Sequence, residues 1–172
     1  MNLTQIRQKT AYTEQPKNDL KMAGRIWSQH MFQGTVAVTL SLKQSFEVVT
    51  NYGIYHKRLD RDECKCIARN FKNKLNQLVY GNAAKKYQKS LEYLISVEGG
   101  AGGLNLHLHM VVGEFPEHIK LNEIEGLILK AKNKVPEMNK EYEVKLCDTG
   151  WNEYVVKTIG KTNTDSILWD LA

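Results

Sequence analysis

The chain has 172 residues, of which 42% are hydrophobic and 25% are charged, and its formal net charge is +5. These proportions are typical of one globular domain, and they exclude a chain that is disordered throughout. No stretch approaches the roughly 18 consecutive apolar residues of a membrane span, and the first residues lack the apolar core of a signal peptide. Three cysteines do not suit a disulfide framework. We therefore expect a cytoplasmic protein without a membrane partner.

The N-terminal part of the chain predicts little regular structure before a first strand. Residues 1–33 are polar and weakly periodic, with one short helix expected around 18–30. Residues 34–42 alternate and are rich in β-branched side chains, which predicts a strand. A poorer strand is expected over 46–55, with a turn at 51–53.

A long helix is predicted over residues 60–80. Its apolar residues recur at helical spacing and form one stripe, made of Cys64, Ile67, Phe71, Leu75 and Leu78. Asp60 or Asp62 is suited to the N-cap, and Gly81 is suited to the C-terminal end. Cys64 and Cys66 are spaced like a metal-binding pair, but positions two apart on a helix differ by about 200° around its axis. We therefore exclude a metal site at these cysteines.

The positive charge is concentrated between residues 57 and 89. This stretch holds ten cations and three acids, a net charge of +7, so the rest of the chain carries −2. A local basic block is typical of a surface that meets phosphates. It is equally compatible with a solvated helix face that keeps the protein soluble.

The rest of the chain predicts a β-hairpin, a helix, a short strand and a last helix. In chain order these are 90–98 and 104–112 around the glycine-rich loop 99–103, then 120–134, 141–147 and 151–161. A helix separates the strand groups and the middle pair is a hairpin. We therefore predict an α+β fold, with an antiparallel sheet and helices mainly on one face.

The strand at 104–112 carries the first candidate site. Side chains alternate between the faces of a strand, so Leu108 and Met110 share the aliphatic face while His107 and His109 share the other. If Glu98 pairs opposite Asn105, its carboxylate falls on the histidine face. Two imidazoles and a carboxylate with open coordination positions are typical of a catalytic divalent-metal site. The same pattern also occurs on a half-exposed sheet surface without a metal.

The predicted helix at 151–161 carries the second candidate site. Tyr154, Lys157 and Lys161 lie at i, i+3 and i+7, which is one face of a helix. A tyrosine in such a helix is usually a residue at the boundary of the core. Nearby cations favour the phenolate, however, and a lysine can hold a phosphate or neutralise developing charge.

Taken in order, VAVTLSL at 36–42, LHLHMVV at 106–112 with an acid upstream, and YVVK at 154–157 resemble the HUH endonuclease superfamily. Within it, the pattern is most similar to the single-tyrosine replication initiators of rolling-circle plasmids, phages and small single-stranded DNA viruses. The resemblance covers about residues 34–161 and implies a ferredoxin-like nuclease domain there. Residues 1–33 are then an N-terminal extension, and 162–172 a C-terminal tail. Apart from the resemblance, we expect Leu168 and Trp169 in this tail to cap the core rather than to form a docking segment.

The resemblance also assigns roles to the candidate residues. His107 and His109 correspond to the histidine pair and Glu98 to the third ligand of Mg²⁺ or Mn²⁺. Tyr154 corresponds to the nucleophile and Lys157 to the lysine of the Y-x-x-K motif. The implied reaction nicks and rejoins single-stranded DNA at a specific sequence or origin hairpin, through a covalent 5′-phosphotyrosine.

The resemblance further implies partners in a bacterial or phage-infected cell. These are the origin DNA, a host helicase and a host polymerase. We expect the DNA backbone to be bound by the strand at 36–42 and by the basic residues, with these candidates: Lys57, Arg58, Arg61, Lys65, Arg69 and Lys161.

Three alternatives remain open. A single-tyrosine HUH transposase has similar chemistry, but such enzymes tend to carry a glutamine one turn after the tyrosine, where this chain has Lys157 and Thr158. A relaxase usually carries a third histidine near the pair, and His118 follows the strand in a loop. A non-catalytic nucleic-acid-binding module would carry stacking aromatic residues on exposed central strands, and 36–42 has none.

Overall fold

The computed structural model describes residues 36–100, 103–147, 151 and 166–171, together with positions 19, 22, 23 and 26. The strands are β1 (Val36–Leu42), β2 (Ser45–Thr50), β3 (Gly53–Arg58), β4 (Glu92–Glu98), β5 (His107–Gly113) and β6 (Met138–Leu146). The helices are α2 (Arg61–Tyr80), α3 (Asn82–Lys86), α4 (Leu121–Lys132) and the short 3₁₀ turn η2 (Trp169–Leu171). None of these helices is long and apolar enough to cross a membrane.

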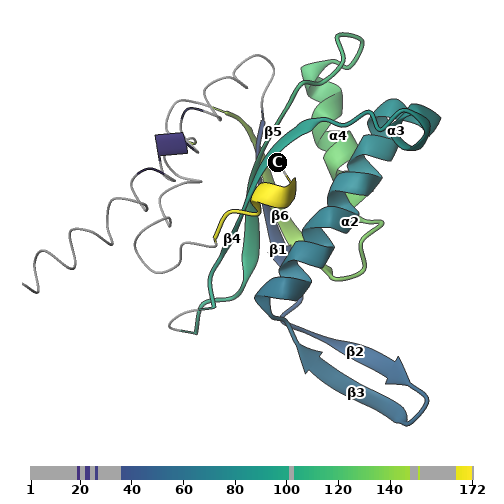
Figure 1. Ribbon diagram of the computed structural model, residues 1–172, viewed down its shortest axis with the longest axis vertical. Coiled ribbons are helices and arrows are strands. Elements are labelled where there is room, and N and C mark those ends of the chain that lie inside the picture. The colour runs from purple at the N-terminus through teal and green to yellow at the C-terminus, as the bar shows by residue number, and fades with distance from the viewer. Residues whose placement is uncertain are drawn as a thin grey trace, which may run out of the picture.

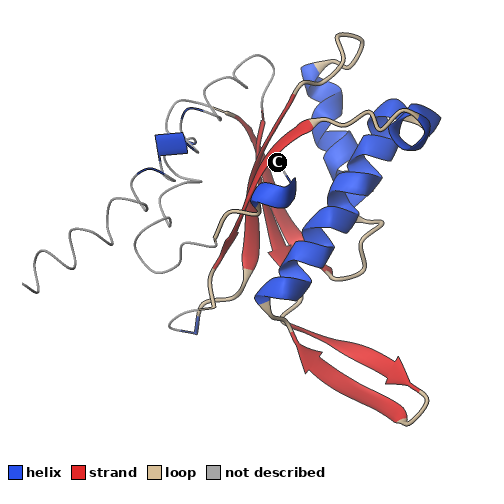
Figure 2. Cartoon of the chain, in the orientation of Figure 1, coloured by secondary structure: helices blue, strands red, loops and turns tan. Residues whose placement is uncertain are grey.

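A four-stranded antiparallel sheet organises the protein, in the order β4-β5-β1-β6. Its strands and the two long helices follow one another as β1, α2, β4, β5, α4 and β6. This β-α-β-β-α-β order, with β1 and β5 in the centre, is compatible with a ferredoxin-like fold. Both α2 and α4 lie on the same side of the sheet (Figure 1, Figure 2). The predicted α+β class is confirmed, and the two long helices of the described residues lie on one face of the sheet (Figure 1), as expected of most of the helices.

The main core lies between the sheet and the two long helices. Leu40 of β1 and Leu108 of β5 are fully buried there with Phe71 of α2 and Ile128 of α4. Each such side chain contributes about 1.5–3 kcal/mol when it leaves water. Hydrophobic burial therefore favours packing of α2 and α4 against the side of each strand that carries these apolar residues.

Helix α2 begins and ends at the predicted residues. The backbone N–H of Glu63 donates to the Asp60 carboxylate at 2.9 Å, and Glu63 accepts from the Asp60 N–H in return, which makes a capping box. Gly81 follows the helix with a φ of 57°, a conformation that favours glycine. Cys64 is buried and Cys66 is exposed, and burial raises the pKa of the Cys64 thiol to about 12. The two thiols therefore lie in different surroundings, as their spacing on a helix predicts.

The segment expected as one poorer strand over 46–55 is instead a separate two-stranded hairpin. β2 and β3 pair only with each other, with Thr50 opposite Gly53 across the turn. The hairpin projects away from the sheet (Figure 1). The sequence prediction placed the turn correctly but missed that the chain after it returns along β2.

The glycine loop before β5 is longer than predicted. Glu98 pairs opposite His107 rather than Asn105, so β5 begins at His107. Gly99 has a φ of 95°, and a Cβ there would collide with the carbonyl oxygen of Asn105. The register differs from the expectation by two residues, and a shift of two keeps every side chain on its predicted face.

Part of the predicted C-terminal tail lies against the sheet. The Val97 N–H donates to the Ser166 carbonyl and the Leu168 N–H donates to the Ile95 carbonyl, both at 2.8 Å. Leu168 and Leu171 are buried in the core, whereas Trp169 is 37% exposed. Of the predicted cap, Leu168 packs into the core and Trp169 lies at its rim.

Candidate metal centre

The candidate metal ligands lie on the sheet face opposite the helices. His107 pairs with Glu98 of β4 on one side and with Ser41 of β1 on the other, while His109 lies between Ser96 and Thr39. Leu108, between the two histidines in sequence, points into the helix-covered core. The alternation predicted from the sequence therefore brings both imidazoles and the carboxylate to one surface.

The three side chains converge on one point. The Nε2 atoms of His107 and His109 are 3.0 Å apart. Glu98 Oε2 lies 3.6 Å from the His109 Nε2 and 3.9 Å from the His107 Nε2. One ligand atom from each residue lies within 4.8 Å of the others, and among the described residues no other such group of His, Cys, Asp and Glu occurs.

Contacts on the far side of each ring determine which nitrogen is available. His107 Nδ1 lies 2.9 Å from the Asn105 carbonyl oxygen, which can only accept, so Nδ1 carries a proton and neutral His107 presents an Nε2 lone pair. His109 Nδ1 lies 3.0 Å from the Thr39 hydroxyl. When that hydroxyl accepts, His109 also presents an Nε2 lone pair. Such outer contacts orient the imidazoles of metal sites.

A cation fits between the facing nitrogens. Two lone pairs 3.0 Å apart repel each other unless a proton or a metal ion lies between them. Metal–nitrogen bonds of about 2.0–2.1 Å at right or tetrahedral angles place two ligand nitrogens about 2.8–3.4 Å apart. Glu98, His107 and His109 can therefore bind a metal ion.

The cluster is largely buried, and His107 is its most exposed member. The side chains of His109 and Glu98 are 5% and 9% exposed, whereas that of His107 is 30% exposed. The ring of Trp151 lies with its centroid 6.0 Å from that of His109. Burial lowers the local dielectric constant, which strengthens any charge interaction at the cluster.

Gln44 and Thr39 are parts of this site that the sequence reasoning missed. The Gln44 side chain accepts from the Leu106 N–H at 2.8 Å and donates to the Leu106 carbonyl at 2.9 Å. These bonds hold the residue directly before His107. Alternation along 36–42 indicates that Thr39 lies opposite the Leu40 face, but the pairing of β1 with β5 is needed to place it beside His109.

Three of the predicted site residues, Tyr154, Lys157 and Lys161, fall outside the part of the chain that the structure describes. Strand β1, also expected to bind DNA, is central in the sheet and mostly buried. Their roles in DNA binding and catalysis stay predictions.

The basic candidates are divided between the hairpin and helix α2. Lys57 pairs with Glu63 and Asp60, and the exposed Arg58 ends β3. The Arg61 guanidinium lies 3.4 Å from the Val97 carbonyl oxygen. The remaining two, Lys65 and Arg69, pair with Asp170 at 2.9 and 3.2 Å.

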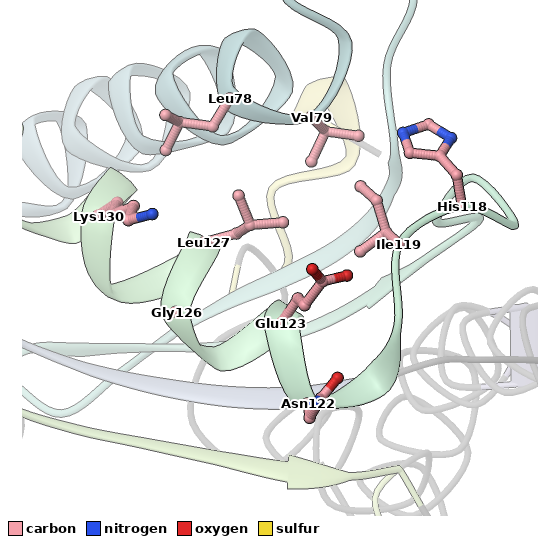
Figure 3. A pocket seen from close by; sticks show the side chains of 9 residues that line it. All are labelled: Leu78, Val79, His118, Ile119, Asn122, Glu123, Gly126, Leu127 and Lys130. Atoms are coloured by element: carbon pink, nitrogen blue, oxygen red, sulfur yellow. The ribbon is translucent and has the colours of Figure 1, made fainter.

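His118 lies away from the metal centre. It lines a cavity of about 430 Å³ between α2 and α4, with Leu127 and Glu123 of α4 nearby (Figure 3). Because α2 and α4 cover the opposite face of the sheet, His118 is not a third histidine of the cluster. His118 therefore does not supply the third histidine that is usual in a relaxase.

The chain matches no protein-family model, no curated protein and no solved structure to which it was compared. A function for this protein must therefore be argued from its own residues. The strongest of these is the group formed by Glu98, His107 and His109, which can hold a metal ion on the sheet face that α2 and α4 leave uncovered.

Proposed function

We propose that the protein is a metal-dependent HUH endonuclease and strand transferase with a single catalytic tyrosine. It would nick and rejoin single-stranded DNA at an origin hairpin, and so initiate rolling-circle replication of a plasmid, phage or small virus. The observation that carries the proposal is the convergence of Glu98, His107 and His109 on one point. The H-x-H strand thus has an acidic neighbour in the position of the third ligand that the resemblance implies.

Trp151 supports the role of Tyr154. Its ring lies 6.0 Å from that of His109, and Tyr154 follows it by three residues in the sequence. Three residues span at most about 11 Å even when fully extended. The proposal requires Tyr154 to lie on the same sheet face as the candidate metal ligands.

The reaction is a transfer of one phosphodiester bond. A divalent ion held by Glu98, His107 and His109 would polarise the scissile phosphate. The Tyr154 oxygen attacks phosphorus in line and loses its proton as the new bond forms. The bond from phosphorus to the 3′ oxygen breaks, and that oxygen takes up a proton to leave a free 3′-hydroxyl. Lys157 neutralises charge on the phosphate, and reverse attack by a 3′-hydroxyl rejoins the strand.

The ligand set bears on the choice between Mg²⁺ and Mn²⁺. Imidazole suits the later transition metals, whereas carboxylate and water suit Mg²⁺, Ca²⁺ and Mn²⁺. Mn²⁺ is itself a first-row transition ion and accepts imidazole more readily than Mg²⁺, so two imidazoles with one carboxylate favour Mn²⁺ over Mg²⁺ in affinity. Mg²⁺ would support the same chemistry at higher concentration.

A covalent-adduct assay tests the proposal. The full chain is incubated with single-stranded origin oligonucleotides and Mn²⁺, and the products are separated on a denaturing gel. We expect a protein–DNA adduct that is abolished in Tyr154→Phe and by EDTA. Tyr52→Phe is the matched control, because Tyr52 is fully exposed at the tip of the β2–β3 hairpin. Binding without any cleavage would instead favour the non-catalytic module.

A further inference from the structure

A polar cavity of about 540 Å³ lies beside the C-terminal end of α2. Its walls come from α2, from α3 and from the segment that leads to β4 (Figure 1). Lys72, Lys85 and Lys89 supply positive charge, and no carboxylate lines it. The other polar side chains are amides and one hydroxyl, from Asn73, Asn76, Gln77, Asn82, Gln88 and Ser90.

The basic block at 57–89 divides into two halves with different surroundings. The first half includes Lys57, Lys65 and Arg69, and the second includes Lys85 and Lys89, which line the cavity. In the first half, Lys57 pairs with Glu63, and Lys65 and Arg69 pair with Asp170. In the second half, no described acid forms an ion pair with Lys85 or Lys89. The second half therefore keeps its charge available for an anion from outside the protein.

The floor of the cavity is held in place by buried polar contacts. Asn76 is 6% exposed. Its oxygen accepts from the Leu91 N–H and the Tyr93 hydroxyl, and its nitrogen donates to Ser90. Lys72 donates to the Leu171 carbonyl at 2.7 Å, and burial lowers the pKa of its ammonium group. An anion in the cavity would meet an already ordered floor.

The cavity is remote from the metal centre. It adjoins Ser90, which precedes β4, whereas Glu98 ends that strand. Seven or eight residues of strand extend about 25 Å, and the two sites also lie on opposite sides of the sheet. A phosphate bound in the cavity cannot be the phosphate at the metal centre.

We propose that this cavity is a second phosphate-binding site, which holds the backbone of a nucleic acid away from the point of cleavage. Lysine ammonium groups neutralise the phosphates, and the amides donate hydrogen bonds to phosphate and sugar oxygens. The choice of DNA as the polyanion rests on the proposed function, whereas the cavity and its charge do not.

The test compares two variants that lose the same charge. Lys85→Gln/Lys89→Gln removes the exposed cations of the cavity, and Lys134→Gln/Lys140→Gln removes two exposed lysines near β6. Binding of a labelled single-stranded oligonucleotide is measured by fluorescence anisotropy, in EDTA, over a series of salt concentrations. We expect the cavity variant to lose about tenfold in affinity at 0.1 M salt, with a salt slope shallower by about 1.4. Equal affinity and slope in both variants would overturn the proposal.

A second arm distinguishes polymer phosphate from a small phosphate ligand. Inorganic pyrophosphate is titrated calorimetrically into the wild-type chain and the cavity variant. We expect weak, millimolar binding that the cavity variant lacks. Tight pyrophosphate binding that depends on Lys85 and Lys89, without an effect of these residues on DNA affinity, would overturn the nucleic-acid assignment.

The proposal can fail separately from the nuclease activity. At saturating oligonucleotide with Mn²⁺, Lys85→Gln/Lys89→Gln should still form the covalent adduct, because its lysines lie far from the metal centre. If Tyr154→Phe also forms adduct, the nuclease mechanism is wrong. The affinity difference between the two lysine variants would still report on the cavity.

Discussion

The two faces of β5 show how one strand serves two purposes. Leu108 and Met110 face the helices and are completely buried, whereas His107 and His109 face the opposite side of the sheet. The first pair fills volume between the sheet and α2, and the second pair brings two nitrogens within 3.0 Å. Substitutions on the two faces of β5 should therefore change stability and metal binding almost independently, although both faces belong to the same seven-residue strand.

The largest expected effect on stability comes from the aliphatic face. Leu108→Ala removes a fully buried side chain and leaves a cavity, which should lower the free energy of unfolding by about 3 kcal/mol. His107→Ala, one residue earlier, should lower it by less than about 1 kcal/mol in EDTA because His107 is part-exposed. Urea unfolding measures both. Equal losses would contradict the division between the faces.

Metal binding at the histidine face of β5 should stabilise the folded protein. A ligand at one hundred times its dissociation constant raises the free energy of unfolding by about 2.7 kcal/mol. We expect Mn²⁺ to raise the thermal midpoint of the wild-type chain but not that of Glu98→Gln. Glu92→Gln is the matched control, because Glu92 is exposed at the other end of β4. A Mn²⁺-induced shift that survives in Glu98→Gln would remove the carboxylate from the ligand set.

Thr39 should affect metal binding, through its contact with His109, more than it affects the free energy of unfolding. Thr39→Val preserves the shape of the side chain but removes the hydroxyl that lies 3.0 Å from His109 Nδ1. Loss of an outer contact of this kind typically weakens metal binding by 10- to 100-fold. Calorimetric titration with Mn²⁺ measures the change, and Thr39→Ser should restore most of the affinity. An unchanged dissociation constant in Thr39→Val would show that the hydroxyl does not orient the ring.

Local patterns in the sequence predict much of this architecture. The alternation at 104–112 identifies the two faces of β5, and Asp60 and Gly81 predict the ends of α2. These features depend on neighbours within a few residues. The pairing of Glu98 with His107 depends on the loop geometry, and the bonds from Gln44 to Leu106 join residues 62 positions apart. Contacts of that range have no local signature, so the register and the support of His107 were missed.

The smallest predicted effect lies at the edge of the helix-covered core, where Asp170 pairs with Lys65 and Arg69. The hydrogen bond from Lys65 lowers the pKa of the Asp170 carboxyl below its ordinary value of 3.8. A lowered pKa in the folded state stabilises the protein above the unfolded-state pKa, and that stabilisation is lost as the pH falls through the folded-state value. Asp170→Asn should therefore lower the thermal midpoint by about 1–2 °C at pH 6.

The difference between Asp170→Asn and the wild type should begin to shrink as the pH falls below 3.8, and it should vanish only below the folded-state pKa, where the wild-type carboxyl takes up its proton. Scanning calorimetry at pH 6 and at a series of values below pH 3.8 measures it. Asp62→Asn is the control, because Asp62 is exposed in the first turn of α2 and makes no ion pair with a described residue. A pH-independent difference would mean that Asp170 stabilises the C-terminal turn through its shape rather than its charge. The metal-binding face should be unaffected, because η2 packs against α2 and β4 on the other side of the sheet.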